Sequence, residues 1–235
     1  MKDRSAEIGA PGPTLRRLAL YHHILVRLRQ GGREVVSCTR IGQELRLDPT
    51  QVRKDIEATG IVGKARIGYD MEPLIASIEE FLGWDNVTEA FLVGAGALGT
   101  ALMGYEGFQA SRLSIVAAFD KDPEKVGRSV HGKEILPLSK FQDLARRMNV
   151  HMGIVTVPAA SAQEVAAMMV QGGIRAIWNF SPIRLETPEE VIVEDVRLSS
   201  SLALLSGRLT RRLRKEREEG AIDDDGNEAG SKAGL

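Results

Sequence analysis

The chain has 235 residues and a net charge of −1, with 43% apolar and 27% charged residues, which is enough for a sizeable core and about two domains. Its apolar runs fall far short of the ~20 residues of a membrane-spanning helix, and the first residues lack the apolar stretch of a secretory signal. A single cysteine, Cys38, and four histidines without metal-ligand spacing exclude a disulfide and a zinc site. We therefore expect a cytoplasmic location, no membrane partner and no bound metal.

The overall charge balance hides a basic N-terminal segment. Residues 1–70 hold 13 Lys and Arg against 8 Asp and Glu, whereas residues 71–200 hold 11 against 17. A basic head on an acidic body suggests contact with a polyanion. Chance scatter of surface charge explains the same asymmetry equally well.

The first domain is expected to begin after a disordered arm over residues 1–13, which are rich in Gly and Pro. Apolar residues at helical spacing predict a helix over residues 14–30, with Thr14 as its N-cap. A second, shorter helix is predicted over residues 38–46.

A third helix is predicted from Pro49 to about Ala58. Asp48 should cap it, and Gln51 should complete a capping box. Two helices joined by a short turn, the second outwardly polar and basic, indicate a helix-turn-helix.

Residues 60–69 then combine glycines with β-branched residues and predict a small hairpin, the wing of a winged helix. Its two cations could reach a minor groove or a phosphate. The alternative is an ordinary three-helix domain with a solvated basic face. We predict a DNA-binding domain over residues 14–83, with DNA contacts from Thr50, Gln51, Arg53, Lys54, Lys64 and Arg66.

After a linking helix over residues 71–83, strands and helices alternate, which predicts an α/β domain over residues 84–196 with a parallel sheet covered on both faces. The strands are expected at 88–93, 113–119, 151–156, 175–178 and 190–195, and the helices at 97–106, 139–148 and 160–171. A final helix over residues 197–219 carries a stripe of leucines that suits a dimer partner, and residues 220–235 are expected to form a disordered tail. The stripe contains Leu198, Leu202, Leu205, Leu209 and Leu213.

The sharpest motif is a GxGxxG between the first predicted strand and helix, formed by Gly94, Gly96 and Gly99. In dinucleotide-binding folds these glycines allow a tight turn, close approach to a pyrophosphate and close packing of helix on strand. Asp120 ends the next strand and could bind the adenine ribose 2′-hydroxyl, which favours NAD over NADP, although Lys121 weakens that preference. The alternative is a glycine-rich turn without a ligand.

A dehydrogenase would also need an acid or base near the nicotinamide. The stretches after the later strands, residues 156–159 and 179–182, contain amides, hydroxyls and an aromatic ring but no His, Lys or acid. We therefore expect a dinucleotide that is bound but not turned over, and no catalytic residue. A small NAD-dependent oxidoreductase with a basic extension is the less favoured alternative.

Taken together, the winged helix, the VGAGALGTAL loop, the AAFDKDPEKVG stretch, and the TVPA and NFSP loops resemble the Rex family of redox-sensing repressors over residues 14–215. The resemblance implies a homodimer with a swapped terminal helix that binds operator DNA and releases it when NADH binds. It implies NAD(H) contacts from Gly94, Ala95, Gly96, Ala97, Leu98, Gly99, Asp120, Lys121, Val157, Pro158 and Phe180.

The resemblance also implies a switch set of Arg, Tyr and Asp that links the first helix, the nucleotide domain and the hinge. Arg17 and Tyr105 match two members, but Arg197 stands where the family has the acid. The family also usually has Asn at the position of Ala97 and a wing that reads Gly-Lys-Arg-Gly-Val-Gly-Tyr. A related protein that binds the dinucleotide and DNA without a redox switch is therefore a second possibility.

Overall fold

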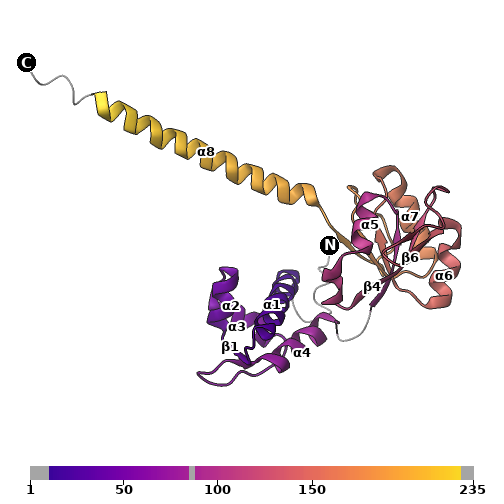
Figure 1. Ribbon diagram of the computed structural model, residues 1–235, viewed down its shortest axis with the longest axis horizontal. Coiled ribbons are helices and arrows are strands. Elements are labelled where there is room, and N and C mark those ends of the chain that lie inside the picture. Colours follow the sequence, from indigo (N-terminus) through magenta and orange to yellow (C-terminus); the bar gives the residue numbers. More distant parts are fainter. Residues whose placement is uncertain (1–10, 85–87, 229–235) are drawn as a thin grey trace, which may run out of the picture.

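The computed structural model describes residues 11–84 and 88–228, and side chains as far as Glu216 apart from that of Leu198. The chain forms a helical N-terminal body and an α/β body, and Figure 1 shows a long terminal helix extending far from the sheet. The predicted α/β class, with a winged helix before a Rossmann-like parallel sheet, is confirmed.

The N-terminal body is built on α1 (Gly12–Gln30) and α4 (Met71–Leu82). The helix-turn-helix, α2 (Cys38–Leu45) and α3 (Pro49–Glu57), packs against α1. Strands β1 (Val35–Val36) and β2 (Tyr69–Asp70) pair antiparallel at the base of the wing. Helical spacing places one apolar stripe of each helix in a shared core, which includes Leu18, Tyr21, Leu25, Ile41, Val52, Ile56, Leu74 and Ile78.

The predicted start of α1 at a Thr14 cap is wrong. The helix begins at Gly12, because a proline in the first turn has a φ suited to a helix and no N–H to leave unpaired. Thr14 lies within the helix and its side chain is buried. Of the predicted arm, residues 12 and 13 are therefore helical, and residues 1–10 lie outside the described residues.

The α/β body holds a seven-stranded sheet in the order β5-β6-β4-β3-β7-β8-β9, parallel apart from the β5–β6 pair. The central strands are β3 (Thr88–Val93), β4 (Leu113–Asp120) and β7 (Met152–Val155). On the side of β4 lie β5 (Ser129–Val130) and β6 (Lys133–Pro137), which the sequence analysis did not predict. On the side of β7 lie β8 (Ala176–Asn179) and β9 (Ile192–Asp195).

Alternate residues of β3 face two separate cores, as the pleat of a strand requires. Phe91 and Val93 pack with α6 (Phe141–Met148) and α7 (Ala159–Gln171). Ala90 and Leu92 share the other core with α5 (Ala97–Met103) and the 3-10 turn η2 (Glu106–Gln109). A second 3-10 turn, η3 (Leu138–Lys140), leads into α6. Helix α5 is shorter than the predicted 97–106, because the chain turns at Gly104.

The terminal helix α8 spans Leu198–Glu228, so residues 220–228 of the predicted tail are helical. Residues 229–235 lie outside the described residues. In the described part of the chain, no helix combines the length and the apolar character that crossing a bilayer would require.

Candidate DNA interface and dinucleotide site

The recognition helix α3 begins at a side-chain cap. The Thr50 amide donates a hydrogen bond of 2.6 Å to Oδ1 of Asp48, as an Asp at the N-cap allows. This hydrogen bond lowers the pKa of Asp48. The predicted capping box is wrong, because the Gln51 side-chain amide donates instead to Asp55, one turn further along the helix.

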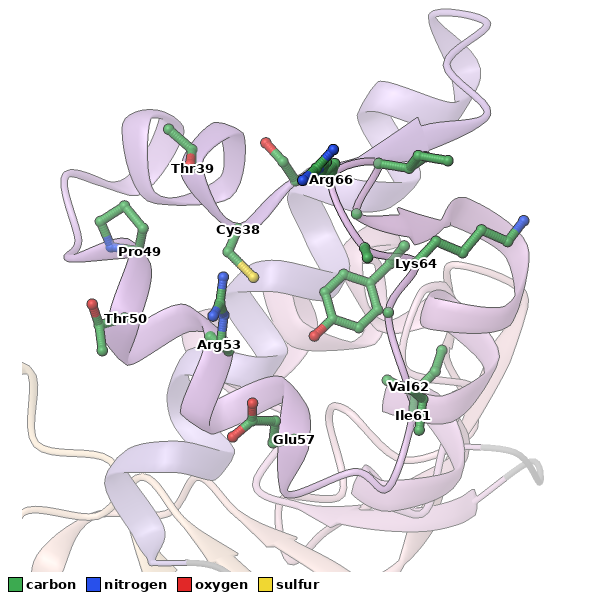
Figure 2. A pocket seen from close by; sticks show the side chains of 16 residues that line it. Cys38, Thr39, Pro49, Thr50, Arg53, Glu57, Ile61, Val62, Lys64 and Arg66 are labelled. Atoms are coloured by element: carbon green, nitrogen blue, oxygen red, sulfur yellow. The ribbon is translucent and has the colours of Figure 1, made fainter.

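The outer face of α3 borders a groove of about 710 Å³ that also touches the start of α2 and the wing (Figure 2). Thr50, Arg53 and Glu57 line it, whereas Lys54 is exposed beside it. Figure 2 shows the Arg53 side chain directed towards Cys38. Burial raises the pKa of the Cys38 thiol, and the Arg53 charge opposes this shift. Of the four positions of α3 predicted for DNA contact, Thr50 and Arg53 thus line one groove, whereas Gln51 and Lys54 do not.

The wing is a tight turn closed by an antiparallel bridge between Lys64 and Gly68. The Lys64 ammonium lies 2.6 Å from the Asp70 carboxylate, whereas Arg66 is exposed at the turn with a φ of 66°. At Gly68, with a φ of 108°, an added Cβ would lie 2.3 Å from the Val36 carbonyl oxygen. The path of the wing past β1 therefore requires glycine at this position.

Asp55 is one residue beside this site that sequence reasoning missed. It lies on the inner side of α3 with 2% of its surface exposed. The Arg17 guanidinium donates from Nε at 2.6 Å and from Nη2 at 2.7 Å, and the Tyr21 hydroxyl donates at 2.7 Å. Thr14 and Gln51 donate the remaining hydrogen bonds at 3.2 and 3.0 Å. We call Thr14, Arg17, Tyr21, Gln51 and Asp55 the Asp55 cluster.

The glycine loop follows β3 as the motif predicts. Gly94 has a φ of 105°, and a Cβ at Gly99 would lie 2.1 Å from the Gly94 carbonyl oxygen, so both positions require glycine. Around Gly96, in contrast, no atom lies within 4 Å of an added Cβ. The chain therefore leaves open the position where a pyrophosphate approaches the backbone in dinucleotide folds.

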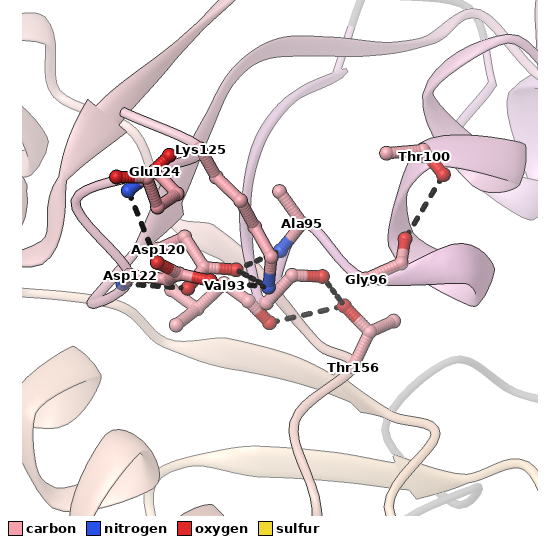
Figure 3. Close-up of polar contacts among 10 residues, drawn as sticks. Val93, Ala95, Gly96, Thr100, Asp120, Asp122, Glu124, Lys125 and Thr156 are labelled. Atoms are coloured by element: carbon pink, nitrogen blue, oxygen red, sulfur yellow. Dashed lines mark hydrogen bonds and ion pairs between the residues drawn. The ribbon is translucent and has the colours of Figure 1, made fainter. Parts of the chain in front are cut away.

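Asp120 ends β4 beside this loop, and its carboxylate is already hydrogen-bonded within the chain (Figure 3). Oδ2 accepts the Ala95 amide at 2.9 Å and contacts the Lys125 ammonium at 3.0 Å, while Oδ1 accepts the Asp122 amide at 2.9 Å. Burial alone would raise the pKa of Asp120, but these donors outweigh it and lower the pKa. A ribose hydroxyl would therefore share an oxygen with groups that hold the loop. Lys121 next to it is exposed.

The loops after β7 and β8 complete this edge of the sheet. Thr156 donates its hydroxyl to the Gly94 carbonyl at 2.8 Å (Figure 3), and the Val157 side chain approaches Gly94. Pro158 caps α7 and is exposed. Phe180 packs on Trp178 with ring centroids 4.9 Å apart.

Asn179 is a second residue that sequence reasoning missed. It is fully buried at the end of β8, where its side chain accepts from the Ser181 amide and hydroxyl and donates to Asp195 at 2.7 Å. It therefore fixes the loop that presents Phe180. The signal for it was a lone amide at the end of a buried strand.

The switch residues named by resemblance are not brought together within one chain. Arg17 is bound to Asp55. Tyr105 is 60% exposed and packs edge-on against Phe108, with the two ring centroids 4.9 Å apart. Arg197 lies 3.1 Å from the Asp195 carboxylate, which is also bound by Asn179.

Helix α8 presents the predicted leucine stripe to solvent. Leu202, Leu205, Leu209 and Leu213 are 46% to 65% exposed, and the Leu198 side chain lies outside the described residues. Monomeric proteins seldom leave a contiguous apolar stripe of this kind uncovered.

Known proteins resemble both parts of the chain. Residues 10–56 match the family described as "Putative DNA-binding protein N-terminus", and residues 85–183 match the "CoA binding domain" family. The redox-sensing transcriptional repressor Rex of Treponema denticola is 44% identical over 193 residues, 82% of this chain and 92% of that protein. The repressor of the same name from Bacteroides fragilis is 42% identical over 199 residues, 85% of this chain and 90% of that protein.

Solved structures match over nearly the same length. The crystal structure of RSP in complex with β-NAD+ and operator DNA has a TM-score of 0.81 and 31% identity, and the match covers 90% of this chain and 97% of that one. The structure of RSP, described as a Rex-family repressor, in complex with β-NADH has a TM-score of 0.79 and covers 88% and 98% of the two chains.

Proposed function

This chain belongs to the Rex family of redox-sensing transcriptional repressors, and we propose that it binds operator DNA as a homodimer and releases it when NADH occupies the Gly94–Gly99 loop. The observation that carries the proposal is the joining, in one chain, of a groove lined by Arg53 and a glycine loop left open at Gly96. The relatives are repressors, so an oxidoreductase is not favoured.

At the nucleotide side, the chain supplies backbone amides and a fixed acid. The amides of the loop and of the first turn of α5 suit a pyrophosphate, and Asp120 holds the loop in place through Ala95. NADH and NAD+ share the adenosine half, so discrimination between them falls to the nicotinamide side. Pro158 and Phe180 present that side from the ends of β7 and β8.

At the DNA side, Thr50, Gln51, Arg53 and Lys54 are presented by α3, and Lys64 and Arg66 by the wing. Phosphate contacts fix the position of such a domain on DNA, and contacts to base edges supply its specificity. A dinucleotide changes DNA affinity only if it binds two conformations of the protein unequally. The winged helix and the nucleotide domain must therefore differ in relative arrangement between the bound and released states.

The leucine stripe of α8 supports the homodimer. The four exposed leucines of this stripe suit a second copy of the same helix or the apolar face of a second subunit. We infer that the stripe is covered in the functional protein and that α8 is exchanged between subunits. A cytoplasmic location follows from this function, because operator DNA lies there.

The test is a titration of an operator duplex, selected by the full-length chain from a random-sequence pool, with NADH and with NAD+. Release by NADH at concentrations where NAD+ has no effect supports the proposal. Binding of dinucleotide with equal effects of both forms would favour the second candidate, a repressor without a redox switch, which the Arg197–Asp195 pair supports. Turnover of NADH without DNA binding would contradict both.

The variant Gly96→Ala separates the nucleotide site from the fold. Its Cβ meets nothing in the chain, since no atom lies within 4 Å, but it occupies the approach to the pyrophosphate. We expect an unchanged melting temperature, unchanged operator affinity without nucleotide, and NADH affinity lowered by about tenfold or more. Wild-type NADH affinity in this variant would place the dinucleotide elsewhere.

A further inference from the structure

The Asp55 cluster joins the recognition helix to the first helix through polar contacts. Three donor side chains, Thr14, Arg17 and Tyr21, come from α1, and the acceptor, Asp55, comes from α3. Gln51 adds a fourth donor from the preceding turn of α3 itself. All of these contacts converge on one carboxylate at the interface of the two helices.

The donors hold Asp55 in its charged form. Burial alone raises the pKa of Asp55, but hydrogen bonds from Arg17, Tyr21 and Gln51 outweigh it, so the pKa lies below its usual value. Burial likewise raises the pKa of Tyr21, and the neighbouring Asp55 raises it further, so its hydroxyl stays protonated and able to donate. The cluster is therefore fully satisfied, which a buried polar network requires.

Stability alone does not account for such a cluster. Buried ion pairs are often no more stabilising than apolar side chains of the same volume, because charged groups lose their hydration. What a bidentate Arg–carboxylate pair adds is direction, since its two parallel hydrogen bonds allow one relative orientation. Apolar contacts such as those of Leu18 and Val52 in the same core have no such directionality.

The cluster lies on the side of α3 that faces away from the groove. At about 100° per residue, Asp55 is roughly 200° around the helix from both Arg53 and Glu57, which line the groove. Asp55 therefore faces away from the groove, and its hydrogen bonds to α1 bear on the rotation of α3 about its own axis. That rotation decides which side chains reach base edges.

We propose that Arg17 and Tyr21 are positioning residues for operator recognition: through Asp55 they fix the rotation of the recognition helix, and thereby the base readout by Arg53 and its neighbours. This inference rests on the proposed function, because it requires sequence-specific DNA binding. It gives Arg17 a role within its own domain, in addition to the role that resemblance assigns to it in the switch. It also makes Gln51 a member of this cluster, since its exposed side chain donates to Asp55.

The experiment measures the affinity of full-length variants for the selected operator duplex and for a mixed-sequence duplex of the same length. Asp55→Asn, Tyr21→Phe and Arg17→Lys weaken the cluster in different ways. The matched control is Arg29→Gln, because Arg29 lies on the same helix α1 and the change breaks its exposed ion pair with Glu72 on α4. Melting temperature, salt dependence and NADH affinity are measured alongside.

If α3 is no longer held in one rotation, its contacts to bases should weaken, whereas contacts to phosphates should be retained. We expect the ratio of operator to mixed-sequence affinity to fall by about tenfold in Asp55→Asn, the loss of roughly one good base contact, and by less in Tyr21→Phe. The slope of affinity against salt should not change, because no phosphate contact is removed. Arg17→Lys should behave like Asp55→Asn, since Lys keeps the charge but cannot form the bidentate pair.

Several results would overturn the proposal. A normal ratio in folded Tyr21→Phe and Arg17→Lys would do so, even if their melting temperatures fall, because the cluster would then be purely structural. If Arg17→Lys behaves like wild type and a further variant, Arg17→Gln, lowers the salt slope, Arg17 contacts phosphate instead and the proposal fails. If Asp55→Asn does not fold, the other two variants still decide. If wild type itself fails to prefer its selected duplex, the proposed function fails, and the cluster proposal with it.

Discussion

Arg66 combines a backbone cost with an available charge. A residue with a Cβ pays about 1–2 kcal/mol for a left-handed conformation, and Arg66 adopts one at the tip of the wing with a φ of 66°. Lys64 is bound to Asp70, whereas Arg66 forms no ion pair with any residue that the structure describes. Arg66 is therefore the wing cation that can approach DNA without first breaking a pair.

We expect Arg66→Asn to weaken operator binding while leaving the protein at least as stable. Asn tolerates the left-handed region better than Arg, so the melting temperature should stay the same or rise. One lost phosphate contact should reduce the salt slope of DNA binding by about 0.9. Fluorescence anisotropy at several salt concentrations checks this, with Ala65→Asn as the uncharged control. An unchanged slope would mean that the tip of the wing does not reach the phosphates.

Asp55 should also make the winged helix sensitive to acid. Because its pKa is lower in the folded state than in the unfolded state, its contribution to stability is fully present above the usual Asp value of about 3.9 and is lost as pH falls through the folded pKa. The difference in free energy of unfolding between wild type and Asp55→Asn should therefore shrink between about pH 5 and pH 2. Urea unfolding at a series of pH values measures it. A difference independent of pH would show that the carboxylate charge is irrelevant.

The residues of the glycine loop could be predicted from the sequence, but the Asp55 cluster could not. Gly94 and Gly99 can be recognised because their motif is local, and a Cβ at either position would clash with neighbouring atoms. Asp55 stands among exposed polar residues of α3, and its burial depends on donors from α1, such as Arg17, 38 residues earlier in the chain. Periodicity within one helix contains no information about a partner so distant in sequence. Thr14 and Gln51 also donate to Asp55, which explains why the sequence-based prediction of both residues as helix caps is wrong.

At the scale of elements, periodicity located the long helices and the central strands correctly. The short strands β5 and β6 were missed, since two to five residues give little periodic signal. The end of α8 was placed too early, at residue 219, because Gly220 and the acidic run after it are poor helix formers. The helical backbone nevertheless continues to Glu228.

The leucine stripe of α8 gives a direct test of assembly. We expect the double variant Leu205→Glu/Leu209→Glu to be monomeric or insoluble, because it places two charges in the proposed subunit interface. Ala203→Glu adds a charge about 120° around the helix from the centre of the stripe and should remain dimeric. Analytical ultracentrifugation distinguishes these outcomes. A soluble dimer of the double variant would show that α8 is not the interface.

In the whole molecule, ion pairs between described residues connect the two bodies. Arg16 on α1 lies 3.0 Å from Glu194 on β9, and Glu79 on α4 lies 3.8 Å from Arg112, just before β4. The first pair is exposed and the second is partly so, and such pairs contribute about 0–1 kcal/mol each. These two pairs therefore oppose relative movement of the bodies only weakly, and a ligand-driven change of arrangement requires such movement.

The substitution Arg197→Asp should strengthen the redox response. In this chain Arg197 is bound to Asp195, and the family resemblance places an acid at this position in the set with Arg17 and Tyr105. We expect Arg197→Asp to enlarge the difference between NADH and NAD+ in DNA release, measured by the same operator titration. Arg197→Gln, which removes the cation without adding an acid, should fall between the two. If wild type already responds strongly to NADH and neither variant changes the response, position 197 lies outside the switch.

The exposed stripe on α8 also links repression to gene dosage. While the chain is dilute relative to the dissociation constant of its dimer, the amount of the paired form grows with the square of the total concentration. Halving the number of gene copies would then cut the paired form about fourfold. A truncated copy that keeps α8 but lacks the winged helix would form mixed dimers with intact chains, and each mixed dimer would have only one DNA-binding domain. Such a copy would act as a dominant inhibitor of the intact repressor.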